Sequence, residues 1–68
     1  MKTHGTVERF DTARGLGEIK AADGATYPFH STVITDGSRT IAVGAAVVFE
    51  VIPGHLGRWE AAAVSPVS

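Results

Sequence analysis

Two glycines one residue apart, Gly15 and Gly17, are the feature that most constrains how this chain can fold. They lie in the run Arg14-Gly15-Leu16-Gly17-Glu18-Ile19, which follows a short β-type segment over residues 6–10 and a turn over residues 11–15. Glycine within a strand usually marks a bulge, a bend or the close approach of another part of the chain. The spacing therefore predicts a strand whose backbone is kept bare on one face.

The chain has 68 residues and no cysteine, so a single hydrophobic core must hold it together without disulfides or thiolate metal ligands. We expect one domain over residues 1–68, with a core from about residue 4 to about residue 64 and a frayed tail over residues 65–68. Its polar start is not followed by an apolar signal region, and no stretch approaches the roughly 20 apolar residues of a membrane span. These features predict a cytoplasmic protein without a membrane segment.

Alternation of residue types places a second strand over residues 16–21. One of its faces is small or apolar and is expected to be buried: Gly17, Ile19 and Ala21. The other face is expected to be exposed: Leu16, Glu18 and Lys20. In the first strand, Val7 and Phe10 are the predicted inward residues, with Glu8 and Arg9 more exposed.

Asp23-Gly24 is the strongest hairpin signal and leads to a third strand over residues 25–30, with Tyr27 and Phe29 facing inward. Pro28 cannot donate a ladder hydrogen bond, which predicts an edge position, a bulge or a short strand. One helical turn is predicted over residues 31–34, capped by Ser31 or Thr32, and a polar loop follows over residues 35–40. A strand is predicted over residues 46–52 and is ended by Pro53-Gly54. A turn at His55-Leu56-Gly57 then leads to a last strand over residues 58–64.

Alanine favours helix over residues 60–63, but four residues without a clear cap are too few to form one alone, so a strand is preferred there. This gives an all-β chain of short strands. Closure into a small barrel is the natural way to protect the edges of so few strands.

Six landmarks in this order resemble the cold shock family: Gly5-Thr6-Val7, Arg14-Gly15-Leu16-Gly17-Glu18-Ile19, Tyr27-Pro28-Phe29-His30-Ser31, Val33-Ile34, Gly44 with the segment 47–51, and Glu60-Ala61-Ala62-Ala63-Val64. The second is similar to the family's first ribonucleoprotein motif, and the third to its second motif. The resemblance implies a five-stranded antiparallel Greek-key barrel, the cold shock type of OB-fold. It also implies binding of single-stranded nucleic acid.

Departures from the family pattern fall on the binding face. Non-aromatic residues stand where the family displays aromatic residues: Arg9, Leu16, Glu18, Pro28, Ser31 and a position near Ser38. The core positions stay apolar: Val7, Phe10, Ile19, Phe29, Ile34, Val47 and Phe49. Because stacking contributes about 1–3 kcal/mol per base, this pattern predicts an intact scaffold with weakened binding. Glu18 is expected to add repulsion toward phosphates.

The candidate binding residues are of two kinds. The basic ones are expected to contact phosphates, with an ordinary solvated face as the alternative: Arg9, Arg14, Lys20 and Arg58. Those expected to meet bases are Leu16, His30 and Trp59. Trp59 has no family counterpart, and a lone tryptophan more often packs, so covering the open end of the barrel is the preferred role for it.

Neither a metal site nor a cofactor is predicted, because the three histidines are far apart and without a ligand pattern. The absence of a nucleophile or phosphate-loop motif indicates a non-enzyme. The net charge of −1 argues against binding by bulk electrostatics. The preferred hypothesis is a monomer that binds single-stranded RNA or DNA weakly and largely without sequence preference. A protein-interaction module on the same barrel and a barrel without a ligand are the alternatives.

Overall fold

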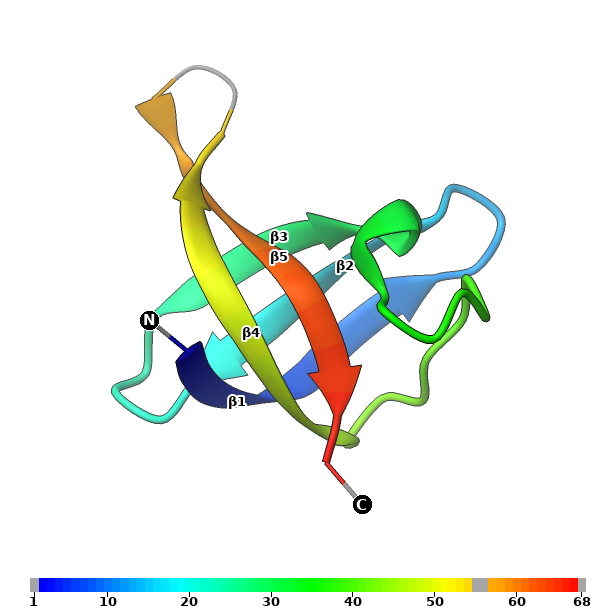
Figure 1. Cartoon of the computed structure of the whole chain (residues 1–68), viewed down its shortest axis with the longest axis horizontal. Coiled ribbons are helices and arrows are strands. Elements are labelled where there is room, and N and C mark those ends of the chain that lie inside the picture. Colours follow the sequence, from blue (N-terminus) through cyan, green and yellow to red (C-terminus); the bar gives the residue numbers. More distant parts are fainter. Residues whose placement is uncertain (1, 55–56, 68) are drawn as a thin grey trace.

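The structure, a computed structural model, describes residues 2–54 and 57–67. Its elements are β1 (Lys2–Asp11), β2 (Leu16–Ala21), β3 (Thr26–His30), the 3₁₀ turn η1 (Ser31–Val33), β4 (Ala46–Pro53) and β5 (Trp59–Pro66) (Figure 1). The strands form one antiparallel sheet in the order β3-β2-β1-β4-β5. The all-β prediction is confirmed, and residues 60–63 are strand. In the described part of the chain, no helix has the length and apolar character that crossing a membrane requires.

The sheet curls so that its two edge strands, β3 and β5, pack against each other. Figure 1 shows β4 and β5 crossing over β2 and β3. Among the described residues, no hydrogen-bonded ladder between β3 and β5 closes the barrel. The segment after η1 instead contacts β5 through a parallel bridge between Ile34 and Val64. Beside this bridge, the Thr35 amide donates to the Val64 carbonyl at 2.8 Å. The arrangement is consistent with the cold shock OB-fold. Pro28 lies on the edge strand β3, as predicted.

A β-bulge in β1 explains why two residues three apart both face the core. The β1–β2 register shifts between Val7 and Arg9, so Glu8 is an extra residue opposite β2. Val7 is therefore buried and Phe10 packs against the core, while Glu8 and Arg9 are both exposed. These four orientations were predicted from the sequence, whereas the bulge was not.

The bare face of β2 is confirmed at Gly17, where the ring of Phe29 lies against the backbone. A Cβ atom at Gly17 would lie 2.7 Å from the Phe29 ring and 2.8 Å from the Arg9 carbonyl oxygen. Phe10 also stacks on Phe29, and the two ring centroids are 5.8 Å apart. Glycine is thus required here by the close approach of a neighbouring side chain and a neighbouring strand.

Gly17→Ala is expected to destabilise the fold by about 1–3 kcal/mol, the usual cost of inserting atoms into a packed interior. Urea unfolding measures this loss. In a Phe29→Leu background the alanine should cost less, because leucine lacks the ring atoms that the new Cβ would meet. A Gly17→Ala variant as stable as the parent protein would contradict the close approach.

The core lies between the two layers of strands and contains Val7, Ile19, Ala21, Phe29, Ile34, Val47, Phe49, Ala61 and Val64. Of the residues predicted to face inward, Phe10 and Tyr27 are partly exposed, and both still pack on this cluster. Ala61 and Val64 both face inward because the β4–β5 register shifts between Val48 and Glu50, beside Ala63 at φ +50°.

Two predicted boundaries are wrong, and one prediction lies partly outside the described residues. β1 extends beyond residues 6–10 at both ends, because its first half pairs with β4 and Asp11 pairs with Leu16 of β2. The predicted frayed tail is ordered through Val67: β5 continues to Pro66, and the Val67 amide donates to the Ala46 carbonyl at 2.9 Å. In the predicted turn over 55–57, His55 and Leu56 lie outside the described residues.

Candidate nucleic-acid interface

The outer face of β1, β2 and β3 consists of three rows of side chains that run across the strands. The antiparallel register sets the rows as Thr6-Lys20-Thr26, Arg9-Glu18-Pro28 and Asp11-Leu16-His30. Successive rows are about 7 Å apart, because alternate residues along a strand face the same side. Most predicted binding residues therefore lie on one face, but at different positions along it.

A hollow of about 650 Å³, here called the His30 hollow, lies over the last two rows. It brings together four of the predicted residues, Arg9, Arg14, Leu16 and His30, with Asp11, Gly17, Glu18, Pro28, Phe29 and Glu60. Leu16 is 48% exposed and can offer an apolar surface to a ligand. Asp11 and Glu60 were not predicted at this site; Glu60 comes from β5, and no local pattern in the sequence indicates that it approaches.

Both arginines of the His30 hollow are paired with carboxylates. Arg9 Nε lies 3.3 Å from Glu18 Oε1, across the β1–β2 pair, and Arg14 Nε lies 3.8 Å from Asp11 Oδ2. Glu18, which is expected to repel phosphates, is thus partly compensated by Arg9. Both pairs are largely exposed, and such pairs stabilise by only about 0–1 kcal/mol. Exchange of a carboxylate for a phosphate is correspondingly inexpensive.

His30 has a structural role as well as an exposed ring. Its Nδ1 accepts a hydrogen bond from the Thr32 amide at 3.3 Å and lies 3.1 Å from Thr32 Oγ1. His30 is therefore the N-cap of η1, and the prediction of Ser31 or Thr32 as the cap is wrong. The Ser31 amide instead donates to the Gly15 carbonyl at 2.7 Å, which ties η1 to the turn before β2. The imidazole is held at the rim of the hollow.

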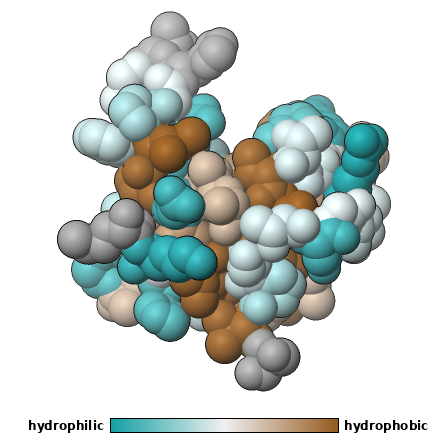
Figure 2. All heavy atoms as spheres, viewed as in Figure 1, coloured by the Kyte–Doolittle hydropathy of each residue, from teal (hydrophilic) through white to brown (hydrophobic). Residues whose placement is uncertain are grey.

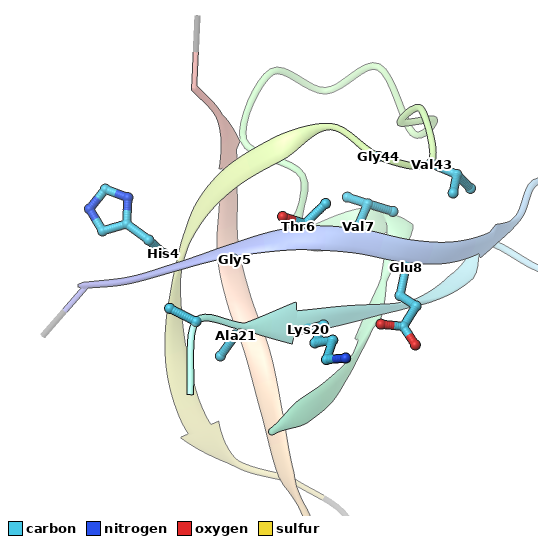
Figure 3. A pocket seen from close by; sticks show the side chains of 10 residues that line it. His4, Gly5, Thr6, Val7, Glu8, Lys20, Ala21, Val43 and Gly44 are labelled. Atoms are coloured by element: carbon cyan, nitrogen blue, oxygen red, sulfur yellow. The ribbon is translucent and has the colours of Figure 1, made fainter. Parts of the chain in front are cut away.

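A second hollow of about 500 Å³, here called the Lys20 hollow, lies on the same side of the sheet at the other end of β2 (Figure 3). It is lined by His4, Gly5, Thr6, Val7, Glu8, Lys20, Ala21, Ala22, Val43 and Gly44. The loop before β4 forms one wall, because the Gly44 amide donates to the Val7 carbonyl at 2.8 Å and the Val7 amide donates to the Ala45 carbonyl at 3.0 Å. Lys20 thus belongs to a different hollow from Arg9 and Arg14. The other residues that line the Lys20 hollow were not predicted to bind a ligand.

Arg58 and Trp59 line neither hollow and lie where β5 begins. Trp59 pairs with Pro53 of β4 and is 57% exposed, so the packing role preferred for it is not observed. Figure 2, which views the molecule from the side of β4 and β5, shows the arm formed by these two strands standing away from the rest of the molecule. Among the described residues, no group of three or more histidine, aspartate or glutamate side chains could hold a metal ion.

Comparison with known proteins shows the family of the chain. No family model matches the chain. It is 37% identical over 65 residues to Cold shock-like protein CspD of Vibrio cholerae serotype O1, and the match covers 93% of this chain and 84% of the relative. The chain therefore belongs to the cold shock-like protein family, which is non-enzymatic and implies nucleic-acid binding in general.

Proposed function

We propose that this protein binds single-stranded RNA or DNA on the face of β1, β2 and β3, weakly and largely without sequence preference. The observation that carries the proposal is the His30 hollow, where basic side chains, an exposed Leu16 and the ring of His30 adjoin one another. Arginine guanidinium groups and histidine rings both stack on unpaired bases. The hollow thus offers substitutes for the aromatic rings that the family displays at Arg9, Leu16, Glu18 and Pro28.

In this proposal the basic residues contact phosphates: Arg9, Arg14, Lys20 and Arg58. Leu16, His30 and Trp59 contact bases. The carboxylate partners of Arg9 and Arg14 compete with the phosphates for these guanidinium groups, which lowers the affinity. The phosphate contacts themselves make the affinity depend on salt. An OB-fold covers about 4–16 nucleotides, enough to include both hollows.

Titration of labelled oligonucleotides at low salt, followed by fluorescence anisotropy, tests the proposal. We expect binding that weakens steeply as salt is raised, since each phosphate contact releases counterions. Chemical-shift mapping should show the largest changes in the three rows of the β1–β3 face. The absence of binding at high micromolar protein, or binding that salt does not affect, would show that the proposal is wrong.

Glu18→Gln is expected to strengthen oligonucleotide binding about two- to fivefold, the equivalent of roughly 0.5–1 kcal/mol. The amide no longer holds Arg9 in an ion pair, and a negative charge leaves the centre of the face. Anisotropy titration at a fixed low salt concentration measures the change. Glu50→Gln, which removes a carboxylate on β4 outside both hollows, is the matched control. An unchanged affinity in Glu18→Gln would argue against a phosphate contact by Arg9.

A protein-interaction module is the second candidate, favoured by the two ion pairs and by the exposed Leu16 among them. A charge-balanced surface with an apolar centre is typical of protein contacts. Pull-down from a lysate with and without nuclease treatment separates the two functions. Partners that survive nuclease and are lost in Leu16→Asp would support the second candidate, whereas partners that vanish with nuclease would support the first.

A further inference from the structure

The Lys20 hollow carries two opposite charges that do not pair. Glu8 and Lys20 both line it, and neither forms an ion pair with another described residue (Figure 3). The other charged side chains at the centre of this face behave differently, because Arg9 is paired with Glu18 and Arg14 with Asp11. The hollow therefore presents a cation and a carboxylate that are not engaged in ion pairs.

The bulge in β1 is the reason that Glu8 reaches this hollow. Because Glu8 is the extra residue between Val7 and Arg9, both Glu8 and Arg9 are exposed rather than one of them facing the core. Bulges commonly re-aim a side chain in this way beside functional sites. Arg9 then pairs with Glu18 in the middle row and lines the His30 hollow. Glu8 lines the Lys20 hollow.

Apart from the polar side chains of His4 and Thr6, the remaining lining of the hollow is apolar or bare. Val43 is 63% exposed at the wall formed by the loop before β4, and Gly44 continues that wall. On the floor, Thr6 is the cross-strand partner of Lys20 and adds a hydroxyl that can donate or accept. The hollow thus combines an apolar wall, a cation and an acceptor that cannot donate.

This combination fits a nucleotide, which has a phosphate, a flat apolar base and an edge with hydrogen-bond donors. We infer that the Lys20 hollow holds one nucleotide of the bound strand, with its phosphate on Lys20 and its base against Val43, and that Glu8 selects cytosine over thymine or uracil. An ionised carboxylate accepts from the N4 amino group of cytosine, whereas thymine and uracil present carbonyl oxygens there. The inference rests on the proposed function and adds one selective position to it.

The test compares oligo(dC) and oligo(dT) hexamers, which have the same charge and bases of the same ring type. The wild-type chain is expected to bind the dC hexamer about five- to tenfold more tightly, the equivalent of one hydrogen bond of typical net strength. Glu8→Gln should bring the two affinities together, because a carboxamide can donate to the thymine carbonyl as well as accept. Lys20→Gln should weaken both hexamers by a similar factor and reduce the slope of log K against log salt by about one contact.

Glu50→Gln, outside both hollows, is expected to keep the wild-type ratio, and thermal melting of each variant establishes that it is folded. Equal affinities of the wild-type chain for the two hexamers would overturn the inference and leave the proposed function standing. So would a ratio that Glu8→Gln does not change, since the preference would then arise elsewhere. Failure of the wild-type chain to bind either hexamer at low salt would overturn the proposed function and the inference with it.

Discussion

The double variant Leu16→Phe and Glu18→Phe is expected to bind single-stranded oligonucleotides at least about 30-fold more tightly than the parent chain. Each phenylalanine adds a stacking platform worth about 1–3 kcal/mol per base, and about 1.4 kcal/mol corresponds to a factor of ten. The two positions lie on the outer face of β2 in adjacent rows, and both line the His30 hollow. Aromatic residues also suit exposed strand positions, so the fold should accept them.

Anisotropy titration with the same hexamers at one salt concentration measures this gain. Val67→Phe is the matched control, because it adds an aromatic ring at an exposed apolar position outside both hollows. Its affinity should equal that of the parent chain. If the double variant also binds like the parent, the outer face of β2 is not the site of base contact, and the protein-interaction candidate gains support.

The sequence predicted the fold well because its signals are local or depend on residue type alone. The Gly15-Gly17 spacing, the alternation in β2 and the Asp23-Gly24 turn each determine the structure of a few consecutive residues. The continuation of β5 to Pro66 was missed because it depends on pairing with β4, far away in the sequence. The cap at His30 was missed because its ring, rather than a serine or threonine hydroxyl, accepts the hydrogen bond.

The binding site was predicted only in part, for a related reason. Residue type and family pattern indicated which side chains lie on the face, and Arg9, Arg14, Leu16 and His30 do share one hollow. The charge balance of that hollow depends on the register that sets Arg9 opposite Glu18. The second hollow depends on a bulge and on the loop before β4, neither of which has a pattern readable from consecutive residues.

Phe29 connects the core to the binding face. It is 3% exposed, its ring lies against Gly17 and stacks on Phe10, and it also lines the His30 hollow. The core of so small a domain therefore forms part of the floor of its candidate site. A change at Phe29 should therefore lower the stability of the fold, and it should affect binding only because less of the protein is folded. Variants of this residue can distinguish a loss of stability from a loss of ligand contact.

Phe29→Ala is expected to lose about 3–5 kcal/mol of unfolding free energy, the usual cost of emptying a buried phenylalanine site. At roughly 0.05–0.15 kcal/mol per residue, the 68-residue chain has only about 3–10 kcal/mol in total, so much of the variant should be unfolded at 37 °C. Urea unfolding and circular dichroism measure the loss. Phe29→Leu, which keeps most of the volume, should remain folded and bind oligonucleotides nearly as the parent does. A Phe29→Ala variant with parental stability would show that the ring is not part of the core. A folded Phe29→Leu variant that no longer binds oligonucleotides would show that Phe29 contacts the ligand directly.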